Sequence, residues 1–275
     1  MGENVVKIDL KSNFSKYLTD MHIEGNNLSN FSRSIHIHAQ SKIVYIHIEG
    51  KGLSPVMTTI LGNKELVEYN LSLEYRLQSL YYQSSLIMEI IYSKISDFIN
   101  NYSKKDNQIE QERILDSFRL QISTILDNLI IYLLSLIEYT LTFVSHLCLK
   151  KIENDWKKFY MLIKDKDSIK FIIPFMKKYN KTIISLKDYR NSLIHKKING
   201  FPLGYSINWD PKENEEMFSF LIGISPEAEK MCKEFIFKSN LDYSNFVTLH
   251  YTISIEFIKI CRELHELIFN NLWFF

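Results

Sequence analysis

The chain has 275 residues, of which 46% are hydrophobic and 13% aromatic, a larger apolar share than a disordered chain carries. Its 33 basic and 32 acidic residues leave a net charge of +1, which excludes a polybasic protein that holds nucleic acid with its whole surface. Only 8 Gly and 5 Pro are present. Such a composition disfavours a sandwich with many tight turns and favours long helices.

The three cysteines, Cys148, Cys232 and Cys261, form neither a CxxC pair nor a spacing typical of zinc ligands. An odd number of widely spaced cysteines fits a reducing compartment. Residues 1–20 mix charged and polar residues throughout, without the apolar run of a secretory leader. We therefore expect a cytoplasmic protein.

Residues 1–62 are predicted to form an N-terminal β-containing element. In Arg33–Ala39 apolar and polar residues alternate, which is the two-residue period of a half-buried strand, and Ile43–Glu49 repeats this period. We expect the two segments to pair as a small antiparallel hairpin with its turn near Gln40–Lys42. Gly50, Gly52 and Pro55 would then close the element.

Residues 63–275 are predicted to form a helical domain. Apolar residues recur at spacings of three and four over 66–102, which predicts a long amphipathic helix. Asn107 and Glu110 fit a capping box for a second long helix that reaches Lys151, either continuous or broken once.

A third helical region covers about 168–197 and contains Pro174, which should kink or interrupt it. Strand-like pieces follow at 205–209 and 217–224, and one or two helices follow Pro226. The chain is therefore predicted to be mainly α, with a bundle of four to five helices and the small N-terminal hairpin.

The segment Leu129–Leu149 is nearly all apolar and long enough to span a bilayer. Glu138 at its centre and His146 near its end oppose a membrane span, because charges inside a bilayer are costly. We interpret the segment as a buried bundle helix, and a membrane-associated helical protein is the alternative. Glu138 and His146 are then either satisfied buried residues or support for a site elsewhere.

A candidate site lies near the end of the third helical region. Asn191 and His195 are four residues apart, so a helix places them on one face, and Arg190 lies about 100° from Asn191. His exchanges a proton near neutral pH, and Arg offers a planar fork to a phosphate. From Lys177 to Lys197 the sequence has six Lys and one Arg against a single acid, Asp188, which indicates a local anion-binding strip.

This stretch resembles the HEPN superfamily. Its signature is an Arg, four to six residues and then a His, often with Asn directly after the Arg, on the third helix of a four- or five-helix bundle. Arg190, Asn191 and His195 fill these positions, and the order of helices extends the resemblance over residues 63–275. Some relatives carry a Tyr two residues after the His as a target for nucleotide addition. Lys197 stands there in this chain.

The resemblance implies a metal-independent endoribonuclease without a cofactor, in a toxin–antitoxin or phage-defence setting. The expected partners are an RNA substrate, a second copy that completes a composite active site, and an antitoxin or other regulator. His195 would act as general base or acid, Arg190 would stabilise the charged phosphorane, and Asn191 would orient His195 or the phosphate. The residues expected to hold the RNA backbone are Lys187, Lys196 and Lys197.

Two other patterns receive weaker interpretations. Arg33 and His38 repeat the Arg-to-His spacing, but Ser34 follows the Arg and the segment alternates like a strand, so we interpret this match as a coincidence. His36, His38 and His47 could line one face of a hairpin as metal ligands, although no Cys or Asp lies at ligand spacing and no metal site is expected. A non-catalytic helical module that binds RNA or protein remains the alternative function.

Overall fold

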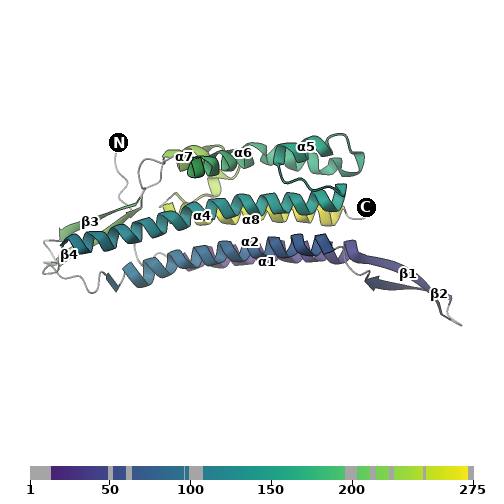
Figure 1. Cartoon of the computed structure of the whole chain (residues 1–275), viewed down its shortest axis with the longest axis horizontal. Helices are drawn as coiled ribbons and strands as arrows, with labels where there is room; N and C mark the ends of the chain where they lie inside the picture. Colours follow the sequence, from purple (N-terminus) through teal and green to yellow (C-terminus); the bar gives the residue numbers. More distant parts are fainter. Residues whose placement is uncertain are drawn as a thin grey trace. The chain divides into compact units, whose positions relative to one another are not determined.

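The structure of the chain is a computed structural model. It describes residues 14–48, 52–59, 64–95, 97–98, 108–195, 203–210, 215–222, 226–243 and 246–271. The long helices among them are α1 (Phe14–Gln40), α2 (Lys64–Glu89), α4 (Gln108–Leu149), α6 (Ile173–His195) and α8 (Phe246–Asn270) (Figure 1). Shorter helical segments are η1 (Ile90–Ile95), α5 (Trp156–Ile163), η2 (Asp167–Ile172), α7 (Pro226–Lys233) and η3 (Lys238–Asn240). The prediction of a mainly α chain is confirmed.

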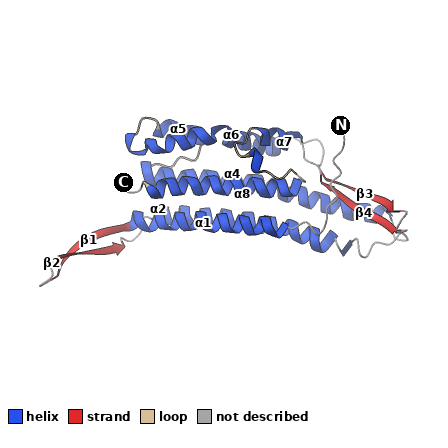
Figure 2. Cartoon of the chain, turned by 180° about the vertical axis from the view of Figure 1, so that it is seen from behind, coloured by secondary structure: helices blue, strands red, loops and turns tan. Residues whose placement is uncertain are grey.

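The described strands form two separate antiparallel pairs, drawn in red in Figure 2. In the first pair, β1 (Ser41–Ile48) runs beside β2 (Gly52–Thr59), with Ser41 opposite Thr59. In the second, β3 (Leu203–Asp210) runs beside β4 (Glu215–Ile222), with Leu203 opposite Ile222. The strand-like pieces predicted at 205–209 and 217–224 lie largely within this second pair.

The strand predicted at Arg33–Ala39 is wrong, because these residues belong to α1. A longer period overrides the local alternation. The apolar side chains that α1 buries completely recur every seventh residue: Phe14, Met21, Leu28 and Ile35. Ile37, which the alternation placed beside Ile35, is 56% exposed. The alternation covers two helical turns, whereas the seven-residue spacing covers the whole helix.

The predicted pairing of the first hairpin is wrong for the same reason. Ile43–Glu49 falls mostly within β1, but the partner of β1 is β2, and Gln40 ends α1 rather than opening a turn. The sequence interpretation placed Pro55 in a closing segment, whereas the structure pairs it with Tyr45. Proline is tolerated there because each strand of a two-stranded sheet is an edge strand, with one side free of ladder hydrogen bonds.

The break predicted at Pro174 is observed as a change of helix type directly before this residue. The 3₁₀ segment η2 ends at Ile172, and α6 begins at Ile173. Pro174 is therefore the second residue of α6, where the backbone N–H that proline lacks has no partner within the helix. The proline ring therefore lies in the first turn of α6 and does not interrupt this helix.

The second predicted helix is observed as α4, which continues unbroken from Gln108 to Leu149. The proposed cap residue Asn107 lies outside the described residues. Among the described helices, Ile109–Leu149 has the length and composition to cross a membrane, and 50% of its most apolar window is buried within the protein. The core helix of a soluble protein has the same length and composition.

The chain divides into two compact units, each made of three segments. The first unit comprises Met1–Ile23, Gln78–Leu134 and Tyr179–Phe257. Its core contains Phe235, Phe237 and Phe257, whose ring centroids lie 5.0 to 5.4 Å apart. The buried Tyr251 hydroxyl donates a hydrogen bond to the Ser84 carbonyl over 2.9 Å, which ties α8 to α2. The predicted division into residues 1–62 and 63–275 stays a prediction.

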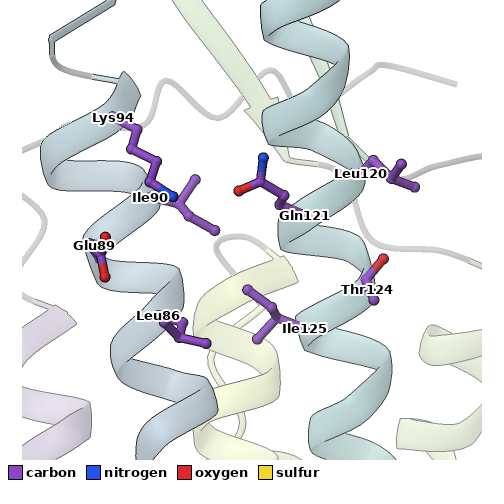
Figure 3. Close-up of a pocket in the computed structure, with 8 residues that line it drawn as sticks. All are labelled: Leu86, Glu89, Ile90, Lys94, Leu120, Gln121, Thr124 and Ile125. Carbon is purple, nitrogen blue, oxygen red and sulfur yellow. The ribbon is translucent and has the colours of Figure 1, made fainter.

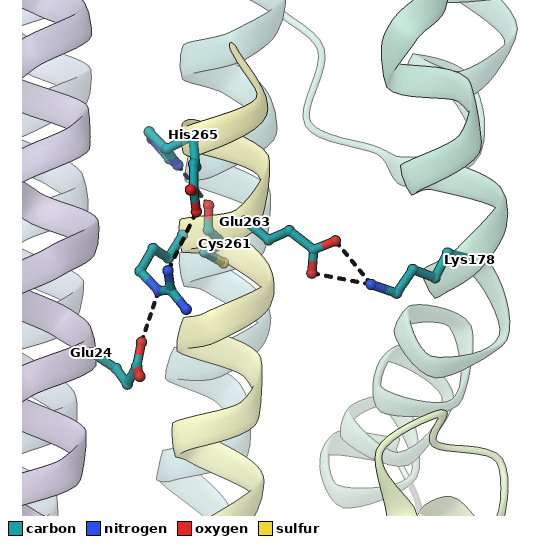
Figure 4. A network of polar contacts seen from close by, with 7 residues as sticks. Glu24, Lys178, Cys261, Glu263 and His265 are labelled. Atoms are coloured by element: carbon teal, nitrogen blue, oxygen red, sulfur yellow. Dashed lines mark hydrogen bonds and ion pairs between the residues drawn. The ribbon is translucent and has the colours of Figure 1, made fainter. Parts of the chain in front are cut away.

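The second unit comprises Glu24–Leu77, Ser135–Lys178 and Ile258–Phe275. Two ion pairs connect α8 to other helices of this unit (Figure 4). Arg262 Nε lies 2.8 Å from a carboxylate oxygen of Glu24 in α1, and Lys178 Nζ of α6 lies 2.9 Å from Glu263. The fully buried ring of His265 stacks on Phe143 at 5.5 Å between centroids.

Acidification is expected to destabilise the protein through His265. Burial lowers the pKa of His265 to about 4, whereas a histidine in an unfolded chain has a pKa of about 6.5. Between these values the unfolded state binds a proton that the folded state does not, so stability falls as pH falls. The expected loss between pH 7 and 5 is about 2 kcal/mol, measurable by urea denaturation at the two pH values.

His265→Leu should remove this part of the pH dependence, and His22→Asn, at an exposed position, should retain it. The variants are compared because a second buried group opposes the effect of His265. Burial raises the pKa of Asp127 to about 6, so the folded state takes up a proton there on acidification and is stabilised. A pH dependence that is the same in His265→Leu and in the wild type would contradict the assignment.

Candidate functional site

The last turns of α6 carry the residues that the sequence singles out. One side of this part of the helix is buried, with side chains no more than 6% exposed: Tyr179, Ile183, Leu186 and Tyr189. Their spacing of three and four residues fixes the rotation of the helix about its axis. Lys187 is consequently exposed, while Arg190 and Asn191 are half-buried at the boundary between the two sides.

Arg190 has a guanidinium group that no carboxylate of a described residue neutralises. Its Nη1 donates a hydrogen bond to Oδ1 of Asn191 over 3.2 Å, and its Nε is buried without a hydrogen-bond partner in the described part of the chain. A guanidinium stays charged at any working pH, and an unsatisfied buried donor costs about 1–3 kcal/mol. A bound anion would satisfy this donor.

His195 is the last residue of α6. Its side chain lies outside the described part of the structure, as do Lys196 and Lys197. The helix places the backbone of His195 one turn after Asn191, so the two residues share a face. The structure therefore brings Arg190 and Asn191 into contact and leaves the contacts of His195 as a prediction.

The second Arg-to-His match is also helical, contrary to the interpretation of Arg33 and His38 as strand residues. Arg33 differs from Arg190 in its partners. Its Nε lies 2.7 Å from Oε1 of Glu74, and this hydrogen bond lowers the pKa of the Glu74 carboxyl. The charge of Arg33 is neutralised, whereas no described ion pair neutralises Arg190. The two positions are a matched pair for experiments.

The predicted basic strip is partly neutralised. Lys178 forms the ion pair with Glu263, and the side chains of Lys177, Lys178, Lys181 and Lys187 are all exposed. Lys187 lies one turn before Asn191 on the same helix. Of the three lysines predicted to hold RNA, it is the one whose side chain the structure describes.

Glu138 and His146 both lie in the second unit, whereas Arg190 lies in the first. His146 is buried, and its ring lies 5.4 Å from that of Tyr69 between centroids. Eight residues along one helix correspond to about 12 Å of rise, too far for a direct contact between Glu138 and His146. Their support for the candidate site stays a prediction.

The interpretation of His36, His38 and His47 as one face of a hairpin is wrong, because His36 and His38 belong to α1. Residues two apart on a helix lie about 200° apart around its axis. Burial lowers the pKa of His36. Among the residues that the structure describes, no group of three or more His, Cys, Asp or Glu side chains is placed to hold a metal ion.

The three cysteines are free thiols. Burial raises the pKa of each of them to about 12. A thiol of this kind forms very little thiolate near neutral pH, and the thiolate is the nucleophile in cysteine chemistry. Cys148, Cys232 and Cys261 are therefore structural residues.

A pocket of about 350 Å³ lies between α2 with η1 and the facing part of α4 (Figure 3). It is lined by Leu86, Glu89, Ile90, Lys94, Leu120, Gln121, Thr124 and Ile125. Sequence reasoning missed it, because its residues come from two helices and no motif joins them. The π-helical turn η1, which contributes Ile90 and Lys94, also interrupts the helical period in a way that the sequence pattern does not reveal.

Comparison with known proteins identifies no relative. No family model, no curated protein and no solved structure matches this chain.

Proposed function

We propose that this protein is a metal-independent endoribonuclease of the HEPN type. The observation that carries the proposal is the half-buried guanidinium of Arg190, whose buried Nε has no hydrogen-bond partner among the described residues and whose Nη1 contacts Asn191. No described carboxylate neutralises this cation, and a phosphate would supply the missing acceptor. The resemblance to the HEPN superfamily adds the chemistry of His195 to this anion site.

The cleavage is proposed to proceed through attack of the ribose 2′-hydroxyl on the neighbouring phosphate. His195 removes the hydroxyl proton, and Arg190 stabilises the negative charge that develops on the phosphorane. Asn191, already in contact with Arg190, orients the guanidinium toward the phosphate. Bond formation between the 2′-oxygen and phosphorus releases the 5′-oxygen, which leaves a 2′,3′-cyclic phosphate.

Lys187, Lys196 and Lys197 are proposed to hold the RNA backbone. They place positive charge before and after Arg190 and His195 in the sequence, so they contribute to binding more than to the chemical step. The expected setting is cytoplasmic, in a toxin–antitoxin or phage-defence system with an antitoxin or another regulator as partner. No membrane association is part of the proposal.

We propose that the active form is a homodimer. The departing 5′-oxygen needs a proton while the 2′-hydroxyl loses one, and these two transfers occur on opposite sides of the phosphorus. A single His195 faces one side. Two motifs related by a two-fold axis supply both the base and the acid from one gene.

The proposed chemistry predicts the ends of the products and the range of substrates. Labelled single-stranded RNA incubated with the purified chain in EDTA should yield 2′,3′-cyclic phosphate and 5′-hydroxyl ends. The same oligonucleotide with one 2′-deoxy residue should resist cleavage at that position, because it lacks the attacking hydroxyl. Gel analysis of both substrates makes the measurement.

Cleavage that EDTA abolishes and a divalent metal restores would contradict the proposal. RNA binding without cleavage, at every RNA tested, would favour the non-catalytic module instead.

A further inference from the structure

The pocket between α2 with η1 and the facing part of α4 belongs to the first compact unit. Its described lining comes from residues 86–94 and 120–125, both within the segment Gln78–Leu134 of that unit. Its volume of about 350 Å³ lies within the range of about 300–1,000 Å³ that is usual for small-molecule sites. The pocket is therefore large enough to hold one small ligand.

Apolar side chains from both sides form the wall of the pocket. Leu86 and Ile90 lie on α2 and η1, opposite Ile125 of α4 (Figure 3). Leu120 also lines the pocket, although 55% of it is exposed. Leu86 and Lys94 are eight residues apart, which corresponds to about 12 Å of helical rise, the length of an extended chain of about ten carbon–carbon bonds. An apolar chain of this length would remove the wall from water, which favours binding.

Lys94 is the one cation among the described lining residues. Figure 3 shows its side chain extending past Ile90 toward the space between η1 and α4. Lys94 makes no ion pair or hydrogen bond with another described residue. Gln121, on the α4 side, uses its Nε2 to donate a hydrogen bond of 2.9 Å to Ser117 Oγ. Lys94 is therefore the charged donor that this lining offers to a ligand.

The charge of the lining limits the charge of the ligand. Glu89 is the one acid among the described lining residues, and Figure 3 shows it on the side of α2 turned away from Gln121. Lys94 alone can neutralise one negative charge. A phosphate monoester carries about 1.5 to 2 negative charges at neutral pH, so it would lack a second cation. The lining therefore favours a head group with a single negative charge, such as a carboxylate.

The π-helical turn η1 is a second feature that points to a ligand. It supplies Ile90 to the apolar wall and Lys94 as the cation. Single π-helical turns are rare, and those that occur lie frequently at functional sites. The irregular part of the helix thus carries both kinds of contact that an amphipathic ligand needs.

We propose that this pocket binds an amphipathic carboxylate, a molecule with one carboxylate head group and an apolar chain of about eight to ten carbons. The chain lies against Leu86, Ile90 and Ile125, and the carboxylate accepts a hydrogen bond from Nζ of Lys94. Charge-assisted hydrogen bonds of this kind are short and strong. The inference goes beyond the proposed ribonuclease and does not depend on it.

Titration calorimetry of the full chain with hexanoate, octanoate and decanoate, all below the concentrations at which micelles form, tests the apolar wall. Each buried methylene strengthens binding about four-fold, so two added carbons should lower Kd about fifteen-fold. Octanol has the chain without the charge, and octyltrimethylammonium has the opposite charge. Both should bind at least ~10-fold more weakly than octanoate, because neither forms the charge-assisted hydrogen bond.

Lys94→Met tests the head group, because it keeps an unbranched stem and removes the ammonium. The variant should bind octanoate at least ~10-fold more weakly and octanol as the wild type does. A general disturbance of the pocket would weaken both ligands. Lys157→Met is the matched control: Lys157 is exposed in α5, does not line the pocket and makes no ion pair with a described residue. This control should bind octanoate with the wild-type affinity.

Ile125→Trp tests the location, because the larger ring fills the pocket from the α4 side. It should abolish the binding of octanoate and of octanol alike. Far-UV circular dichroism checks the fold of each variant. If Ile125→Trp does not fold, the comparison of Lys94→Met with Lys157→Met decides the matter, since both lysines are exposed.

Three results would overturn the inference. They are the absence of saturable binding with decanoate at ~1 mM, binding of octyltrimethylammonium as tight as that of octanoate, and equal losses of octanoate affinity in Lys94→Met and Lys157→Met. Octanoate binding that Lys94→Met weakens selectively, in a protein that cuts no RNA, would support the pocket and refute the nuclease.

Discussion

Arg190→Ala is expected to lower RNA cleavage by about a hundredfold or more, as does the loss of a positioned group that stabilises charge in a transition state. The fold should persist, because the substitution removes a buried donor that no described residue satisfies. We expect thermal stability that is equal to or higher than that of the wild type. Single-turnover cleavage rates and melting curves measure the two effects.

Arg33→Ala is the matched control, because Arg33 is also an arginine five residues before a histidine near the end of a helix. Its guanidinium contacts Glu74 and is largely exposed. Arg33→Ala should therefore leave cleavage unchanged. Equal losses of cleavage in the two variants would contradict the assignment. They would show that any lost positive charge slows cleavage, wherever it lies in the protein.

His195→Ala is expected to lower cleavage by about a hundredfold to ten-thousandfold, the range for a general acid or base. The wild-type rate should fall on acidification as the imidazole takes up a proton, and this acid limb should be absent from the residual activity of His195→Ala. Cleavage rates between pH 5 and 8 provide the measurement. His22→Ala, at an exposed position in α1, should retain both the rate and the acid limb. If the dependence of the cleavage rate on pH has the same shape in His195→Ala as in the wild type, the titrating group is another residue.

The long helices α2, α4, α6 and α8 were predictable, because each carries several turns of apolar residues at spacings of three and four. The break before α6 was predictable for a local reason, since Pro174 cannot lie inside a helix without cost. Helix α1 was missed. Its seven-residue spacing is visible in the sequence, but polar residues dilute it, and the alternation at Arg33–Ala39 gave a stronger local signal.

The partners of charged residues were not predictable in the same way. Spacing places Asn191 one turn before His195 on the same helix face and Arg190 about 100° from Asn191. The hydrogen bond between Arg190 and Asn191 depends in addition on the conformations of the two side chains. The difference between Arg33 and Arg190 depends on Glu74, which lies in another helix. Periodicity cannot reveal such a contact, because it arises from the packing of two helices.

The pairing of the first hairpin failed for a similar reason. A strand pattern shows that a segment such as Ile43–Glu49 is extended, but it does not select the partner strand. The segment had two candidate partners, one on each side in the sequence. Because the residues before β1 belong to α1, the strand that pairs with β1 is β2.

The central claim is that Arg190 and His195 act as one catalytic site, and a double-mutant cycle tests it most directly. Single-turnover cleavage of one labelled RNA in EDTA is measured for the wild type, Arg190→Ala, His195→Ala and the double variant. Residues that act as a unit are strongly non-additive, so the double variant should be within a few-fold of the slower single variant. Single variants that cleave at the wild-type rate, or losses that multiply to about ten-thousandfold, would contradict a shared site.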